Sequence, residues 1–203
     1  MSIETGRPVL VLGIGNILWA DEGFGVRCVE ELHRRWSFPD DVLVMDGGTQ
    51  GLYLVHYVKA ARRVIVFDAI DYGEEPGTLR LVRGEEVPKF TGAKKMSLHQ
   101  TGFQDVLSAA ELLGGTLDDI LLIGVQAVEL DDYGGSLTPP VRARIEPALA
   151  VAVEQLERWG YPATPRTAAP DHLLHGGIGL ADYEAGRPSA EDACRVGDSR
   201  FFA

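Results

Sequence analysis

The sequence has little cysteine, few basic side chains and no long apolar run, and each shortage excludes a class of protein. Two cysteines, Cys28 and Cys194, are too few for a disulfide framework or a thiolate zinc site, and they fit a reducing compartment. With 19 Lys and Arg against 30 Asp and Glu, the net charge of -11 disfavours binding to nucleic acid. No window of about 18 apolar residues could span a membrane, and the first residues are too acidic for a signal peptide. We therefore expect a cytoplasmic protein.

The sequence also lacks a covalent nucleophile and a complete nucleotide fingerprint. No serine lies in a G-x-S-x-G elbow, and Cys28 belongs to the apolar stripe of a predicted helix. The segment 13–18 (GIGNIL) begins like a dinucleotide-binding loop, but Leu18 stands where the third glycine should be. We therefore expect tight turns at these glycines, no bound nucleotide, and water as the attacking group in any hydrolysis.

Short apolar runs alternate with helical patterns along most of the chain. Four runs are typical of buried parallel strands, at residues 9–12, 42–45, 64–67 and 120–125. Helical spacing of apolar residues follows the first two runs and recurs at 103–110 and after the fourth run. Thr138 is expected to cap the last long helix, with Pro139 at its first position. The alternating stretch 78–82 predicts an exposed edge strand. This pattern predicts an α/β fold with three α/β/α layers, a mostly parallel twisted sheet and a single domain.

The composition changes beyond Pro162, where prolines, glycines and scattered charges replace the periodic pattern. We therefore expect an α/β domain over residues 1–161 and a weakly ordered C-terminal tail over residues 162–203.

Acidic side chains follow three of the predicted strands, at the edge where parallel sheets bind ligands. Asp21 and Glu22 lie between glycines ahead of the first helix, Asp46 ends the second strand and Asp68 ends the third. One acid suffices to cap a helix, so Glu22 can point at a ligand; the alternative for both acids is capping. Burying a carboxylate such as Asp68 is costly unless it is paired or bound to a metal; the alternative is a structural Asp that holds the following turn.

One histidine completes a donor set with two of these acids. His99 lies just ahead of the predicted Phe103 helix, where the helix dipole favours the neutral imidazole that binds metals. With Glu22 and Asp68 it makes two carboxylates and one imidazole, which can hold a divalent transition metal and leave coordination positions open. The other histidines are expected to be surface or packed residues, the last two forming a weaker metal candidate: His33, His56, His172 and His175.

Several motifs together resemble the nickel-iron hydrogenase maturation endopeptidases over about residues 7 to 160. They are Gly13-x-Gly15-Asn16-x-Leu18-x-x-Asp21-Glu22-Gly23-x-Gly25, Asp46-Gly47-Gly48-Thr49, Asp68-Ala69 and Ser97-x-His99-Gln100. The resemblance implies a cytoplasmic protease that removes a C-terminal extension from the hydrogenase large-subunit precursor after nickel insertion. It also implies Glu22, Asp68 and His99 as nickel ligands, with the nickel supplied by the precursor.

Our expectations for the site follow from both arguments. The partner is the large-subunit precursor, the chain acts as a monomer without nucleic acid or membrane span, and Asp46 is a candidate base or peptide-binding residue. Two alternatives remain open: a hydrolase with its own zinc or manganese at the same three residues, and a non-catalytic chaperone of the immature large subunit.

Overall fold

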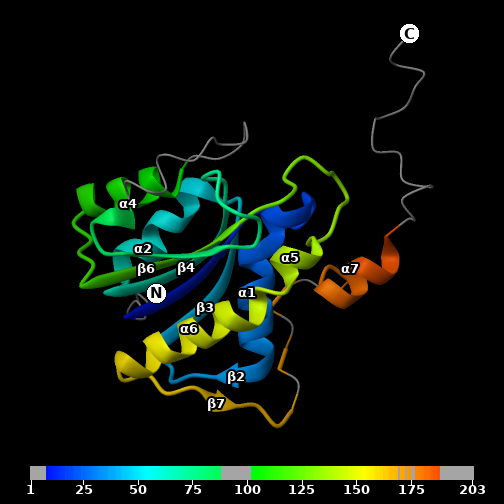
Figure 1. The fold of residues 1–203 in the computed structure, drawn as a ribbon. Coiled ribbons are helices and arrows are strands. Elements are labelled where there is room, and N and C mark those ends of the chain that lie inside the picture. The colour runs from blue at the N-terminus through cyan, green and yellow to red at the C-terminus, as the bar shows by residue number, and fades with distance from the viewer. Residues whose placement is uncertain (1–7, 88–101, 169, 172, 175–176, 188–203) are drawn as a thin grey trace.

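The computed structural model describes residues 8–87, 102–168, 170–171, 173–174 and 177–187. Five strands form one sheet in the order β3-β1-β4-β6-β5, with helices on both faces (Figure 1). The parallel strands are β1 (Val9–Ile14), β3 (Val42–Gly48), β4 (Arg63–Ile70) and β6 (Asp119–Gln126). At one edge, β5 (Leu79–Arg83) runs antiparallel to β6, as predicted. The three-layer α/β architecture is thus confirmed.

Helices α1 (Phe24–Arg35) and α6 (Ile145–Arg158) cover one face, and α2 (Val55–Ala60) and α4 (Phe103–Leu112) cover the other (Figure 1). Strand side chains alternate between the two layers: Val9 and Val11 of β1 join the core beneath α1 and α6, whereas Leu10 and Leu12 join the core beneath α2 and α4. Because both faces are buried, the strands read as continuous apolar runs.

The last long helix differs from its prediction. It begins after Thr138, but it forms two pieces, α5 (Pro139–Arg142) and α6, instead of one. Pro147 explains the break, because it has no N–H to donate to the carbonyl of Ala143 and its ring crowds that turn. Likewise, the helix expected after Thr49 starts as a 3-10 turn, η2 (Gly51–Leu54), before α2.

The described part of the segment after Pro162 lies against the sheet domain. Strand β7 (Thr164–Pro165) pairs antiparallel with β2 (Trp36–Ser37), and α7 (Leu180–Gly186) lies beside α5 (Figure 1). The domain boundary at residue 161 stays a prediction. Within the described residues, no helix combines the length and the apolar character that crossing a membrane requires.

Candidate functional site

Two of the predicted site residues lie on the strands that flank β1, near its carboxyl end. Gly13 of β1 is in register with Asp46 of β3 on one side and with Phe67 of β4, the residue before Asp68, on the other. Asp68 lies within β4, which continues to Ile70, and only 7% of its surface is exposed. Asp46 and Asp68 therefore both lie near the carboxyl end of the sheet, on the two strands that flank β1.

Strand alternation sends these two carboxylates to different faces of the sheet. Phe67 and Ala69, the neighbours of Asp68, belong to the core beneath α1, so Asp68 faces the layer that contains α2 and α4. Asp46 is in register with Gly13, whose α-carbon faces Gly25 of α1. Asp46 and Asp68 therefore lie on opposite sides of β1, and their side chains face opposite layers of helices.

The adjacent acids Asp21 and Glu22 have different environments in η1 (Ala20–Gly23). Asp21 is fully buried, and its carboxylate accepts hydrogen bonds from the backbone N–H groups of Val128 and Glu129 and from the N–H and hydroxyl of Thr138, at 2.7 to 3.0 Å. Glu22 is half-buried. Asp21 therefore ties the segment after β6 to η1, and of the two acids Glu22 is the better candidate ligand.

Two glycines allow η1 to approach the end of the sheet closely. A Cβ on Gly25 would lie 2.2 Å from the carbonyl oxygen of Phe67 and 2.3 Å from that of Ile14. Gly15 has φ of +136°, and a Cβ there would lie 1.8 Å from the carbonyl oxygen of Glu22. Because side chains are absent at both positions, η1 contacts β4, and Glu22 comes from a segment next to the strand that carries Asp68.

The turn after β4 is held by a buried glutamine that ends β6. The side-chain oxygen of Gln126 accepts the backbone N–H groups of Tyr72 (2.9 Å) and Glu74 (3.2 Å), and its amide donates to the carboxylate of Asp71. Burial, together with the negative charge of Asp68, raises the pKa of Tyr72 to about 12, so its hydroxyl keeps its proton near Asp68. No sequence pattern marks Tyr72 as a site residue, because a tyrosine in a turn has no distinctive spacing.

Asp46 has an electrostatic environment suited to proton transfer. Its Oδ1 accepts the N–H of Gly48 at 2.8 Å. Burial raises the pKa of Asp46, and the hydrogen bond from Gly48 and the positive charge of Arg27 on α1 offset part of that rise. A carboxyl with a raised pKa is a better base than an ordinary surface aspartate.

The third predicted ligand, His99, lies outside the described residues, as do His172 and His175. The convergence of Glu22, Asp68 and His99 therefore stays a prediction; among the residues that the structure describes, no group of three or more His, Cys, Asp or Glu side chains is arranged to hold a metal ion. His33 is half-buried, with Nε2 3.0 Å from the carbonyl oxygen of Asp171, and His56 is exposed, with its ring tilted against that of Tyr57. Both are therefore surface or packed residues, as expected.

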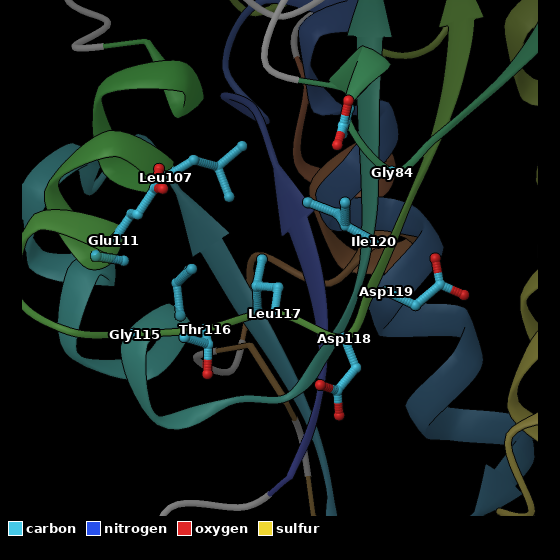
Figure 2. A pocket seen from close by; sticks show the side chains of 12 residues that line it. Gly84, Leu107, Glu111, Gly115, Thr116, Leu117, Asp118, Asp119 and Ile120 are labelled. Carbon is cyan, nitrogen blue, oxygen red and sulfur yellow. The ribbon is translucent and has the colours of Figure 1, made fainter.

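A cavity of about 480 Å³ lies at the other end of the sheet, where β6 begins. Figure 2 shows its walls: Leu107 and Glu111 come from α4, and Leu117 and Ile120 belong to the chain that enters β6. Since Asp119 begins β6 and Gln126 ends it, this cavity is separated by the length of the strand from the acids described above. It does not belong to the candidate site.

Comparisons with known proteins agree with one another. Residues 26–155 match the family model described as hydrogenase maturation protease. The hydrogenase expression/formation protein HupM of Azotobacter chroococcum is 59% identical over 195 residues, which cover 96% of this chain and 93% of that protein. The hydrogenase 2 maturation protease of Escherichia coli is 44% identical over 165 residues, covering 80% of this chain and 99% of that protein.

A solved structure supports the same relationship. The hydrogenase maturating endopeptidase HybD from E. coli aligns with a TM-score of 0.73 at 42% identity, covering 78% of this chain and 98% of that one. About a fifth of this chain therefore lies outside the alignments with the E. coli proteins.

Proposed function

The chain belongs to the hydrogenase maturation proteases, and from that premise we propose how this endopeptidase recognises and cuts its substrate. The substrate is the precursor of a hydrogenase large subunit. In our proposal the enzyme removes the C-terminal extension of a nickel-iron precursor after nickel insertion, and Glu22, Asp68 and His99 bind the nickel carried by that precursor. The observation that carries this proposal is the contact between η1, which bears Glu22, and β4, which bears Asp68.

The donor set suits a metal that belongs to the substrate. Two carboxylates and one imidazole satisfy only part of a nickel shell, which leaves positions for cysteine thiolates of the precursor. His99 precedes α4, and α4 covers the face toward which Asp68 points. The roles of the two adjacent acids also fit, because Asp21 is bound by the segment after β6 while Glu22 is only half-buried.

Cleavage requires a water molecule and a base near the docked bond. We assign Asp46 as the base: it takes a proton from the water as the water attacks the scissile carbonyl, and the proton then passes to the leaving amine. Its raised pKa favours this role. Asp46 is in register with Gly13 of β1, which places it near the same carboxyl end of the sheet as Asp68. Binding of the nickel orients the peptide bond toward the water and the base. Cleavage therefore depends on a precursor that already carries its nickel.

The test compares nickel-loaded and nickel-free precursor by mass spectrometry. His99→Ala, Glu22→Gln and Asp68→Asn are expected to lose processing of the loaded precursor while remaining folded by circular dichroism. The matched control is Glu75→Gln, an exposed acid in the turn after β4, which should cleave normally. Normal processing by a folded His99→Ala variant would remove the ligand assignment.

One alternative keeps the same residues but gives them a resident metal. A hydrolase with its own zinc or manganese would purify with stoichiometric metal in the absence of precursor, whereas the docking proposal expects little bound metal until the precursor is added. Metal analysis of the purified protein separates the two. Membership of a protease family decides against the non-catalytic chaperone.

We further propose that the chain acts as a monomer in the cytoplasm. Its buried free Cys28 fits a reducing compartment. Cell fractionation and the molar mass in solution test these two statements separately.

A further inference from the structure

A second pocket, of about 290 Å³, lies between the segment that follows β1 and the end of α7. Leu18 and Tyr133 line it on one side, and Asp182, Tyr183 and Arg187 line it on the other. None of these residues has a part in the docking and cleavage steps proposed above.

The first wall comes from the loop between β1 and η1 and from the segment after β6. Leu18 precedes Glu22 by four residues, and its carbonyl accepts the N–H of Gly134 at 2.7 Å. Trp19 and Tyr133 form an isolated antiparallel bridge, with their rings edge to face at 5.2 Å. Asp21 then fixes the same segment after β6 through its four hydrogen bonds. The first wall of the pocket is therefore fixed to the loop that leads into η1, the element that carries Glu22.

The second wall is fixed to the domain by side-chain hydrogen bonds from α7. The hydroxyl of Tyr183 donates to the carbonyl of Gly135 at 3.1 Å. Glu184 accepts from Ser136 at 2.7 Å and from Arg142 at 2.6 Å. Because both walls are held in place, the pocket is formed before anything binds, and little ordering is needed when a ligand enters.

A buried arginine also holds the segment that leads into α7. Arg27 donates to the carbonyl of Ile178 at 2.7 Å and to Glu30 at 2.9 Å, and Glu30 in turn accepts the N–H of Leu180. The ring of Tyr183 lies 5.4 Å from the guanidinium carbon of Arg27. These contacts join α7 to α1, the helix that follows Glu22.

The walls combine exposed apolar surface with an unsatisfied donor. Leu18 is 40% exposed and Tyr133 is 55% exposed, so both offer apolar surface to a ligand. The Nε–H of Arg187 is buried, and no acceptor among the described residues binds it. A buried donor without an acceptor is unfavourable, and an incoming carbonyl or carboxylate oxygen would satisfy it.

We propose that this pocket is a subsite for the precursor polypeptide, close to the bond that is cut. An apolar side chain of the precursor packs against Leu18 and the tyrosine rings, and a main-chain carbonyl or a carboxylate of the same segment accepts from Arg187. The inference rests on the proposed function, because the occupant is the polypeptide that the candidate site cleaves. The α7 wall follows the segment 26–155 matched by the family model, so it is a part of the pocket that family members need not share.

The test uses substitutions that leave the backbone contacts of the pocket intact. In Leu18→Glu the backbone hydrogen bonds of the loop remain, and in Arg187→Met only the donor is lost. We expect each to raise KM for nickel-loaded precursor about tenfold with little change in kcat, because the subsite binds ground state and transition state alike. The matched controls are Leu112→Glu, at an 88% exposed leucine of α4, and Arg144→Met, at an exposed arginine; both should keep the parent KM.

Two further measurements keep the outcomes distinct. Glu22→Gln, assayed in parallel, tests nickel docking; its loss of cleavage together with an unchanged KM in both subsite variants would overturn the subsite and leave the proposed function standing. A photo-crosslinking amino acid at position 18 of the full chain covers the case in which a variant does not fold. A crosslink mapped to the precursor near its cut site supports the subsite, whereas a crosslink confined to residues 188–203 of the enzyme itself contradicts it.

Discussion

Both carboxylate oxygens of Asp21 bind Thr138, with Oδ1 accepting the backbone N–H at 2.7 Å and Oδ2 accepting the hydroxyl at 2.9 Å. Thr138 lies just before α5, so this pair connects the turn after β1 to the start of the last helices. Glu22, the next residue, is half-buried. Of these two neighbouring acids, Asp21 therefore has a structural role and Glu22 is the candidate ligand.

Asp21→Asn is predicted to destabilise the protein by about 2 kcal/mol or more. An amide has one acceptor oxygen, so its NH2 group would face backbone donors that the carboxylate now satisfies. Urea unfolding measures the loss. Glu22→Gln is the matched control and should keep its stability within about 0.5 kcal/mol. Equal stability of Asp21→Asn and the parent would show that the buried carboxylate does not hold η1 to the segment after β6.

Asp46 is predicted to make stability and cleavage depend on pH in opposite directions. Because burial raises its folded-state pKa, the folded protein binds the proton more tightly than the unfolded chain, and the stabilisation present in acid is lost as the pH rises through the raised pKa. The stability of Asp46→Asn relative to the parent should therefore increase from about pH 4, near the pKa of a free aspartate, toward neutrality. Unfolding at a series of pH values checks the sign.

Cleavage should follow the ionised form of the same group. If Asp46 is the base, the rate falls as the pH drops through its raised pKa, and Asp46→Asn loses most of the rate at every pH. Asp105→Asn, at an exposed acid of α4, is the control. An undiminished rate for Asp46→Asn would assign the base elsewhere.

Gln126→Leu is predicted to cost about 2 kcal/mol and to slow cleavage. The leucine has nearly the same size, but it leaves the N–H groups of Tyr72 and Glu74 without their acceptor, and the turn after Asp68 loses its anchor. Thermal unfolding and the cleavage rate are the measurements. Gln104→Leu, on the exposed face of α4, should change neither. A Gln126→Leu variant with unchanged stability would be incompatible with this anchoring role.

Arg27→Met is predicted to destabilise the protein by about 3 kcal/mol and to release α7. Arg27 is 2% exposed, and its loss leaves Glu30 and the carbonyl of Ile178 without their cationic partner. Limited proteolysis around residue 180 should become faster. Arg62→Met, which breaks an exposed pair with Asp118, is expected to have a far smaller effect. If proteolysis is as slow as in the parent, the anchoring of α7 does not depend on Arg27.

Local patterns were sufficient for most of the sheet. The four apolar runs became the parallel strands because each packs against helices on both faces, although the edge strand β3 is only partly buried. The alternating stretch at 78–82 became the antiparallel edge strand β5. The start of the last helix was predictable from Pro139, which lies at its first position. The expected side-chain cap by Thr138 is wrong, because its hydroxyl donates to Asp21 instead. The break at residues 143–144 also follows from the sequence, because Pro147 has no N–H to donate to the carbonyl of Ala143.

The sequence by itself determined the order of strands and helices and the placement of acids at the carboxyl edge, because periodicity and turn residues act over short distances. Only the tertiary structure decided that the carboxylate of Asp21 accepts hydrogen bonds from Thr138 and that Arg27 holds the segment leading into α7. It also decided that Asp46 and Asp68 lie on opposite sides of β1. Each of these depends on a partner more than 30 residues away in the chain or on strand register, and no local pattern encodes such a distance. The register and the long-range hydrogen bonds form only when the sheet and its two helical layers pack together.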